Sequence, residues 1–270
     1  MPQFRQKLRI RFAKRGDLRF ISHHDLMRLW ERACRRAALP LRMSEGFNPR
    51  PRLSFPLSLA VGIEGREEVA EVQLDDWLAP AEVQRRLQAA LPADVALAEV
   101  AAVDPQRKAA VVGVTCVVEH EALGRLSQGD LEALLARREI LAPRRRKATG
   151  RRGIHRDEQD TQDAAGEDRA GAVVDIRPYI RALALLPGGT EESTGMSRID
   201  RLTDGLARPE PHPVHPVHPR LRPPGLRIEL KVTPGGTARP DEVLKALGVL
   251  PGPEDPAPRI TRERVRLADQ

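Results

Sequence analysis

The residues most suited to chemistry are two adjacent histidines in a Ser-His-His-Asp segment at residues 22–25. Imidazoles exchange protons near neutral pH, and the free N–H groups at the start of a helix attract anions. RNA cleavage without a metal needs a base for the 2′-hydroxyl and an acid for the leaving oxygen, roles open to His23 or His24. The alternative is that Ser22 and Asp25 cap a helix while a histidine packs locally. Because the sequence shows no second catalytic group, no catalytic residue is assigned and the two histidines remain candidates.

A helix that follows this segment would carry four arginines on one face, opposite an apolar stripe. They stand at positions i, i+4, i+7 and i+8, namely Arg28, Arg32, Arg35 and Arg36. Residues at these spacings are neighbours on a helix surface. Their guanidinium groups repel one another unless an anion binds, so the pattern favours contacts with a phosphate backbone. The alternative is a solvated basic face, partly neutralised by Glu31 or by the acidic segment 67–76.

A third candidate is the turn-rich segment at residues 46–52, which reads Gly-Phe-Asn-Pro-Arg-Pro-Arg. Glycine permits a positive φ, each proline fixes φ, and Asn48 can hydrogen-bond to its own backbone. Such dense specification predicts a loop held for presentation, in which Phe47 stacks on a base while Arg50 and Arg52 reach phosphates. The alternative is a structural connection with Phe47 in the core.

The charge of the chain is concentrated around these three segments. Residues 5–66 contain 15 Lys and Arg against five Asp and Glu, a net charge of +10, whereas the whole chain carries +7. A sequence pI near 10.1 favours a polyanionic partner, RNA or DNA. The competing explanation is an arginine-rich composition, but such a bias does not account for the clustering at one end.

Periodicity predicts the elements that position these residues. In the first half we expect strands at 7–12, 53–61, 67–74 and 95–103, with helices at 22–40 and 80–91. This order is β-α-β-β-α-β, the split βαβ or ferredoxin-like plan. The second half repeats it loosely, with strands at 109–119, 140–146, 173–177, 226–232 and 260–267 and helices at 127–137 and 240–247. The expected fold is therefore α+β, with two tandem ferredoxin-like halves at residues 1–104 and 105–270.

Two insertions interrupt the predicted second half, at residues 147–171 and 187–224. The first is polar with almost no apolar residues and the second is rich in Pro and Gly, so both are expected to be flexible. The second contains three histidines two residues apart, His212, His215 and His218, which would share one edge of a polyproline II helix. No carboxylate or cysteine completes a ligand set, and no metal site is assigned.

The remaining composition excludes several classes of protein. The two cysteines, Cys34 and Cys116, lie far apart without cysteine or histidine at ligand spacing, so no disulfide framework, zinc knuckle or iron–sulfur motif is expected. Cys34 falls on the apolar side of a predicted helix, which indicates a buried reduced thiol. No signal-peptide core and no apolar run of membrane-spanning length is found, so we expect a cytoplasmic protein.

Several motifs together carry a family resemblance. In the first half they are residues 18–28 (LRFISHHDLMR), 39–41 (LPL), 44–55 (SEGFNPRPRLSF) and 61–64 (VGIE). In the second half they are residues 174–178 (VDIRP), 239–244 (RPDEVL) and 261–262 (TR). They resemble the radical-SAM-linked protein family, a domain of unknown function that is often fused behind a radical-SAM module and is sometimes free-standing. His24 departs from the family pattern, which more usually has an apolar residue there.

The resemblance implies an accessory role beside a separately encoded radical-SAM enzyme, because this chain lacks the three closely spaced cysteines that hold the cluster. The leading hypothesis is a non-catalytic protein that binds RNA or another phosphate-rich partner through its N-terminal half. The second hypothesis is a metal-independent endoribonuclease that uses His23 or His24. The third is a docking module that contacts the radical-SAM enzyme through the basic surface.

Overall fold

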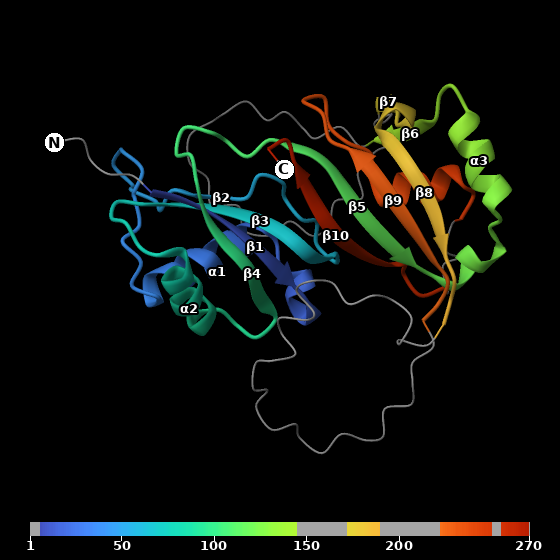
Figure 1. Ribbon diagram of the computed structural model, residues 1–270. Coiled ribbons are helices and arrows are strands. Elements are labelled where there is room, and N and C mark those ends of the chain that lie inside the picture. The colour runs from blue at the N-terminus through green and yellow to red at the C-terminus, as the bar shows by residue number, and fades with distance from the viewer. Residues whose placement is uncertain (1–5, 145–171, 190–221, 250–254, 270) are drawn as a thin grey trace, which may run out of the picture.

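The computed structural model describes residues 6–144, 172–189, 222–249 and 255–269. Over these residues the protein is α+β, as predicted, with one mixed sheet of eight strands, a separate two-stranded sheet and four α-helices (Figure 1). The large sheet has the strand order β4-β1-β3-β10-β5-β9-β8, and β2 pairs with β3 beside this path. A short parallel pairing of β3 with β10 joins the strands that come early and late in the chain.

The N-terminal elements alternate as predicted from periodicity. They are β1 (Gln6–Lys14), α1 (His23–Arg36), β2 (Leu53–Ser54), β3 (Glu64–Leu74), α2 (Pro80–Ala90) and β4 (Val95–Val103). Their strands are antiparallel neighbours in the order β4-β1-β3-β2. Helices α1 and α2 lie together on one side of these strands (Figure 1).

The second strand is much shorter than the sequence pattern indicates. Alternation predicts a strand over 53–61, but β2 ends at Ser54. Pro56 has no N–H group to donate to a ladder, and the carbonyl oxygens of Leu57 and Ser58 accept hydrogen bonds from Arg262 of β10. The chain then turns at Gly62, whose φ is +85°. The backbone groups of this segment are thus satisfied by a residue about 200 positions away, which local periodicity does not reveal.

The later elements are less regular. They are β5 (Val111–Glu119), α3 (Gln128–Ala136), β6 (Leu141–Arg144), β7 (Ala172–Asp175), β8 (Ile180–Leu186), β9 (Gly225–Lys231), α5 (Pro240–Ala246) and β10 (Arg259–Leu267). Strands β6 and β7 form the separate two-stranded sheet. The other four strands are antiparallel neighbours in the order β10-β5-β9-β8.

Strand β1 differs from the half-buried strand that its alternating sequence predicts, because both of its faces are buried. Leu8, Ile10 and Phe12 face the core beneath α1 and α2. On the opposite face Lys7 and Arg9 are also covered, with exposed fractions of 5% and 8%. These charged side chains are tolerated because both form ion pairs with Glu71 of β3, and Arg9 also pairs with Asp269.

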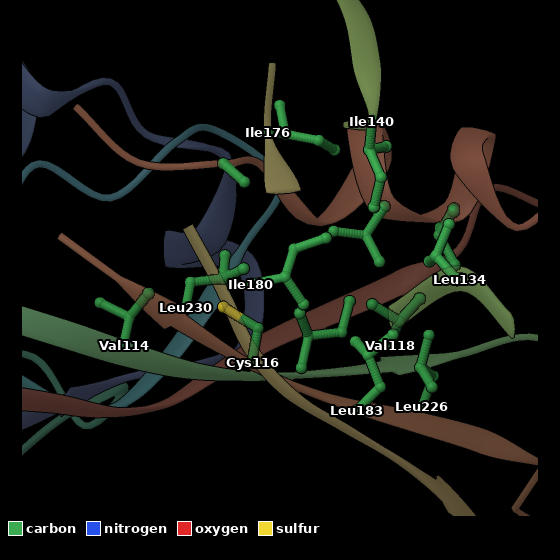
Figure 2. Packing of buried hydrophobic residues seen from close by; sticks show 14 of the residues in the cluster. Val114, Cys116, Val118, Leu134, Ile140, Ile176, Ile180, Leu183, Leu226 and Leu230 are labelled. Carbon is green, nitrogen blue, oxygen red and sulfur yellow. The ribbon is translucent and has the colours of Figure 1, made fainter. Parts of the chain in front are cut away.

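Two apolar cores hold the molecule together. One contains residues of β1, α1, β3, α2 and β4, and the other gathers residues mainly from the later elements. Figure 2 shows the second core, in which Cys116 and Val118 of β5 and Ile180 and Leu183 of β8 lie on one face of the sheet, with Leu226 and Leu230 of β9 between them. Val69 of β3 belongs to this second core. The far face of the N-terminal strands is therefore packed against the later part of the chain.

Two serines begin the longest helices of the two parts. Ser22 caps α1, because its Oγ accepts a hydrogen bond from Asp25 N at 3.1 Å. Ser127 caps α3 in a reciprocal capping box with Asp130. Both caps lie where the sequence predicts a helix start. The apolar stripe of α1 is also buried as expected, including Leu26, Trp30 and smaller apolar residues of the helix.

Most of the two predicted insertions, together with the three histidines of the Pro-rich segment, lies outside the described residues. At the described ends of the second insertion, Gly189 and Arg222 exchange backbone hydrogen bonds of 3.2 and 2.8 Å. Within the described part of the chain, no helix is long and apolar enough to cross a membrane.

Candidate nucleic-acid interface

The start of α1 is occupied by its own cap. The hydroxyl of Ser22 accepts from Asp25 N and donates to Asp25 Oδ2 at 2.7 Å. These hydrogen bonds lower the pKa of Asp25. Ser22, proposed from the sequence as an anion contact, is therefore used for capping here, and its hydroxyl is directed to a carboxylate.

The two histidines at this helix start have different surroundings. His23 is half-buried with its ring edge-on to Phe55, the centroids 5.8 Å apart, whereas His24 is exposed. Burial, and to a lesser extent the neighbouring His24, lowers the pKa of His23. Its Nδ1 is buried and has no hydrogen-bond partner among the described residues. His23 is thus held neutral beside an aromatic ring, without the oriented acid–base pair that catalysis of RNA cleavage requires.

The arginine face of α1 is exposed as predicted. Arg28 lies 4.0 Å from Asp25, with 72% of its side chain exposed. Arg32 and Arg35 are exposed and have no ion pair with any described residue. The guanidinium of Arg36 donates to the carbonyl oxygen of Ala90, at the end of α2, at 2.6 Å. This leaves three of the four positive charges open to a ligand.

The acidic segment of β3 does not neutralise this face, contrary to the alternative reading of the sequence. Glu71 pairs with Lys7 and Arg9 on the opposite face of the sheet. Glu67 lies near arginines of β1 and β10. Glu68, which lies across from Phe12 of β1, pairs with Arg262 of β10. No acid of this segment forms an ion pair with α1 in the described chain, because Glu67, Glu68 and Glu71 pair with basic residues of β1 and β10.

A groove between α1 and α2 gathers further positive charge. It has a volume of about 670 Å³, and its lining residues are Leu29, Arg32, Arg36, Arg86, Ala89, Ala90, Leu91 and Pro92. Three of these residues are arginines and none is acidic. Arg86 is engaged by Glu82 of its own helix at 2.5 Å, whereas Arg32 keeps all of its donors available. The groove is therefore an apolar-floored channel edged with guanidinium groups.

The turn-rich segment forms a closed loop at the edge of the sheet. Ser44 and Arg50 join its ends, since Ser44 N donates to Arg50 O at 2.7 Å and Arg50 N donates to Ser44 Oγ at 3.0 Å. Gly46 has a φ of +122°, which glycine adopts without strain. Phe47 is fully exposed, so the alternative that it packs in the core is wrong. Asn48 and Arg50 are exposed as well.

The base of this loop brings two arginines together. Arg52 N donates to Arg42 O at 2.8 Å, and Arg42 N donates to Gln73 O of β3 at 2.9 Å. Both arginines line a pocket of about 400 Å³ that also includes Gln6, Gln73 and the turn at residues 104–106. The loop residues and the α1–α2 groove share no lining residue, so the predicted interface consists of two separate sites.

Sequence reasoning missed two residues of this end of the molecule. Arg42 entered the sequence argument only through its contribution to the net charge. Its distance in sequence from Phe47 equals that of Arg52, which is the spacing expected for two residues paired across a hairpin. Trp77 was not considered, yet it is 60% exposed and follows β3 by three residues. Its exposure was indicated by its position directly after Asp75 and Asp76, because burial is unfavourable beside two acidic residues.

The Gly-Gly-Thr segment at 235–237 is a structural turn. Thr233 and Gly236 exchange two backbone hydrogen bonds of 2.9 Å, and Gly236 has a φ of +123°. Within the described ranges, no group of three or more histidine, cysteine or acidic side chains is arranged to hold a metal ion.

The fold and these surfaces define a basic α+β protein with an arginine-lined groove and an exposed aromatic loop. Residues 7–202, well over half of the chain, match a bacterial family described as "Uncharacterized protein conserved in bacteria (DUF2344)". The protein belongs to this family. A search of curated proteins gave no match.

Proposed function

We propose that this protein binds RNA through its N-terminal part and does not itself catalyse a reaction. The observation that carries the proposal is the groove between α1 and α2, where Arg32, Arg36 and Arg86 surround an apolar floor with no acidic lining residue. Guanidinium groups bind phosphates through several N–H donors, and the apolar floor can accept sugar or base surfaces.

The distribution of acidic residues supports the same surface. Glu71 is paired with Lys7 and Arg9 on the far side of the sheet, and Glu68 is paired with Arg262 of β10. These glutamates do not neutralise the positive charge of the arginines on α1, so a polyanion that approaches this side is attracted at long range. A separate phosphate contact by Arg50 and Arg52, with a base stacked on Phe47, would extend the RNA along the N-terminal part.

Two ferredoxin-like halves, at residues 1–104 and 105–270, form the proposed framework. The antiparallel orders β4-β1-β3-β2 and β10-β5-β9-β8 support this arrangement. Counted along the chain within each half, both place the strands in the order fourth, first, third, second. In each half one helix follows the first strand and another follows the third. The β6–β7 hairpin is an addition to the plan in the second half.

The motif resemblance to radical-SAM-linked proteins supports an accessory role in the cytoplasm beside a separate radical-SAM enzyme. Cys34 and Cys116 are both buried, and burial raises the pKa of each thiol to about 12. Neither thiol is suited to hold a cluster or to act as a nucleophile. We therefore assign to this chain the holding of the RNA, and to the partner enzyme any radical chemistry.

A salt titration tests the RNA proposal. The variant Arg28→Gln/Arg32→Gln/Arg35→Gln removes three exposed charges and leaves the Arg36–Ala90 hydrogen bond intact. Anisotropy of a labelled single-stranded RNA should show binding weakened by about tenfold or more, because phosphate contacts are lost. The slope of log K against log salt should fall in magnitude by about 2, the value for three phosphate contacts with a single strand.

The matched control is Arg125→Gln/Arg137→Gln/Arg138→Gln, which removes the same charge from exposed positions around α3. It should leave the slope unchanged. Equal loss in both triple variants would mean that only net charge matters, and the proposed interface would be wrong. If wild-type protein retains no RNA at low salt but purifies from its native cells with a radical-SAM enzyme at high salt, the docking hypothesis replaces the RNA proposal.

RNA integrity decides between a binding protein and the endoribonuclease hypothesis. Incubated RNA should remain intact, since His23 has no oriented acid–base partner among the described residues. Cleavage by wild type that is abolished in His23→Ala/His24→Ala would overturn the non-catalytic assignment.

A further inference from the structure

The pocket at the base of the exposed loop contains an unusual arginine. Arg42 retains an exposed fraction of only 9%. Its backbone is held on both sides, by Gln73 of β3 and by Arg52. Its side chain lines the pocket of about 400 Å³. Yet its guanidinium makes no hydrogen bond or ion pair with any described residue.

Other buried arginines in the molecule are paired. Arg9, with an exposed fraction of 8%, pairs with Glu71 and with Asp269. Arg262, with 7%, is held by both carboxylate oxygens of Glu68 and by two carbonyl oxygens. Removing a charge from water is unfavourable unless a counter-charge or hydrogen bonds replace the water. Arg42 departs from this pattern, because its guanidinium opens into the pocket and has no partner among the described residues.

The charge of the neighbouring residue increases the need for an anion. Arg52 lies directly across the hairpin from Arg42 and lines the same pocket. Like charges opposite each other destabilise a strand pair. The only carboxylate among the lining residues, Asp104, already accepts a hydrogen bond from Gln106 N at 2.8 Å. An anion between the two guanidinium groups would satisfy both of them.

The remaining surroundings indicate what the anion is attached to. Gln73 and Gln106 line the pocket and present amide groups that can both donate and accept. The loop that rises from Arg42 and Arg52 carries the fully exposed ring of Phe47 and is closed at its base by Ser44 and Arg50. Phosphate donors, amides and an exposed aromatic ring are the groups that recognise a nucleotide.

We propose that this pocket binds one nucleotide of a single strand, with its phosphate between Arg42 and Arg52 and its base stacked on Phe47. The volume accommodates a nucleotide rather than an isolated phosphate. The inference rests on the proposed RNA binding, which it narrows to single-stranded or free nucleotides, but its site is separate from the groove on α1. Nucleotide binding in the pocket and RNA binding in the groove can therefore be tested, and refuted, independently.

Binding of small probes to the full chain tests the pocket. Calorimetry with AMP, ribose 5-phosphate, adenosine and inorganic phosphate should give the tightest binding for AMP and none for adenosine. Arg42→Gln should weaken AMP binding by about tenfold or more, since a charge-assisted contact is lost. Phe47→Ala should weaken AMP roughly five- to 100-fold, the effect of one lost stacking contact, and leave ribose 5-phosphate unchanged.

Thermal stability separates a ligand-binding arginine from a structural one. Without ligand, Arg42→Met should melt at a higher temperature than wild type, because the repulsion between Arg42 and Arg52 across the hairpin is removed. AMP should raise the melting temperature of wild type and of the Arg125→Gln control, but not that of Arg42→Met. A lower melting temperature for Arg42→Met without ligand would show that Arg42 is structural and overturn the inference.

Comparison of the probes shows whether the bound phosphate belongs to an RNA strand, to a free nucleotide or to inorganic phosphate. A short single-stranded RNA that binds more tightly than AMP, and loses affinity in Arg42→Gln, supports a strand. AMP binding with no such gain supports a free nucleotide. Equal affinity for inorganic phosphate and AMP, with no effect of Phe47→Ala, would overturn the nucleotide assignment. Normal AMP binding by the α1 triple variant would support the pocket even where the RNA groove fails.

Discussion

At the scale of single residues, His23 shows how burial selects a charge state. Its ring packs edge-on against Phe55, and burial lowers its pKa below the ordinary value of 6.5. The unfolded chain therefore binds the proton more readily than the folded protein does. Above pH 6.5 both states are neutral, and as the pH falls below this value the free energy of unfolding decreases until the pKa of the folded state has been passed.

The variant His23→Phe isolates this effect, since it keeps an aromatic ring against Phe55 and removes the titrating group. Melting temperatures measured from pH 8 to pH 5.5 should fall more steeply for wild type than for His23→Phe. His24→Phe removes an exposed ring and should keep most of the wild-type slope. Parallel curves for wild type and His23→Phe would contradict burial as the origin of the shift.

At the scale of elements, the start of α1 depends on one hydroxyl. Ser22→Ala removes the acceptor of Asp25 N and the donor to Asp25 Oδ2, and loss of such a cap costs about 1 kcal/mol. Urea unfolding should show this loss as a lower midpoint with an unchanged slope. Ser58→Ala alters an exposed serine whose hydroxyl makes no contact with the described residues, and it should unfold like wild type. A midpoint equal to wild type in Ser22→Ala would show that the cap does not stabilise the helix.

Elements defined by neighbouring residues were predictable from the sequence, and those defined by distant partners were not. Ser22 and the spacing of Leu26 and Trp30 fix α1, so its start and buried face follow from the sequence. The shortening of β2 and the burial of Arg9 depend on β10, whose register with β3 no local pattern contains. In the candidate site, the exposure of Phe47 followed from its loop, but the unpaired state of Arg42 required the hairpin partner and the pocket.

At the scale of the whole molecule, the C-terminal strand organises the charge of the N-terminal part. Strand β10 and the residues that follow it bring arginines and Asp269 to β1 and β3, where they pair with Arg9, Glu64 and Glu68. The acids of β3 are thereby committed to joining the two parts of the sheet. Arg32 and Arg35 of α1 have no ion pair with the described residues, and with the arginines of the groove they give this side of the N-terminal part its positive charge.

The Arg262–Glu68 pair is the central contact of this junction. Both residues are buried, and the guanidinium also donates to the carbonyl oxygen of Ser58 at 3.0 Å. Arg262→Met leaves Glu68 buried without its hydrogen-bonded partner, so we expect a loss of about 3–5 kcal/mol in the free energy of unfolding. Arg262→Met/Glu68→Met removes both charges of the pair, but it also removes the carboxylate beside the buried Lys14 and leaves the carbonyl contacts broken, so it should recover only part of that loss.

Denaturant unfolding, followed by tryptophan fluorescence and by far-UV circular dichroism, measures both losses of stability. Trp30 lies in the N-terminal core, so the two probes should remain coincident if the halves still unfold together. Arg264→Met is the matched control, because it removes an arginine that lies on the same strand but is 62% exposed and pairs with Glu67 at the surface. It should cost less than about 1 kcal/mol. Equal losses for Arg262→Met and Arg264→Met would show that the buried pair does not hold the two parts of the sheet together.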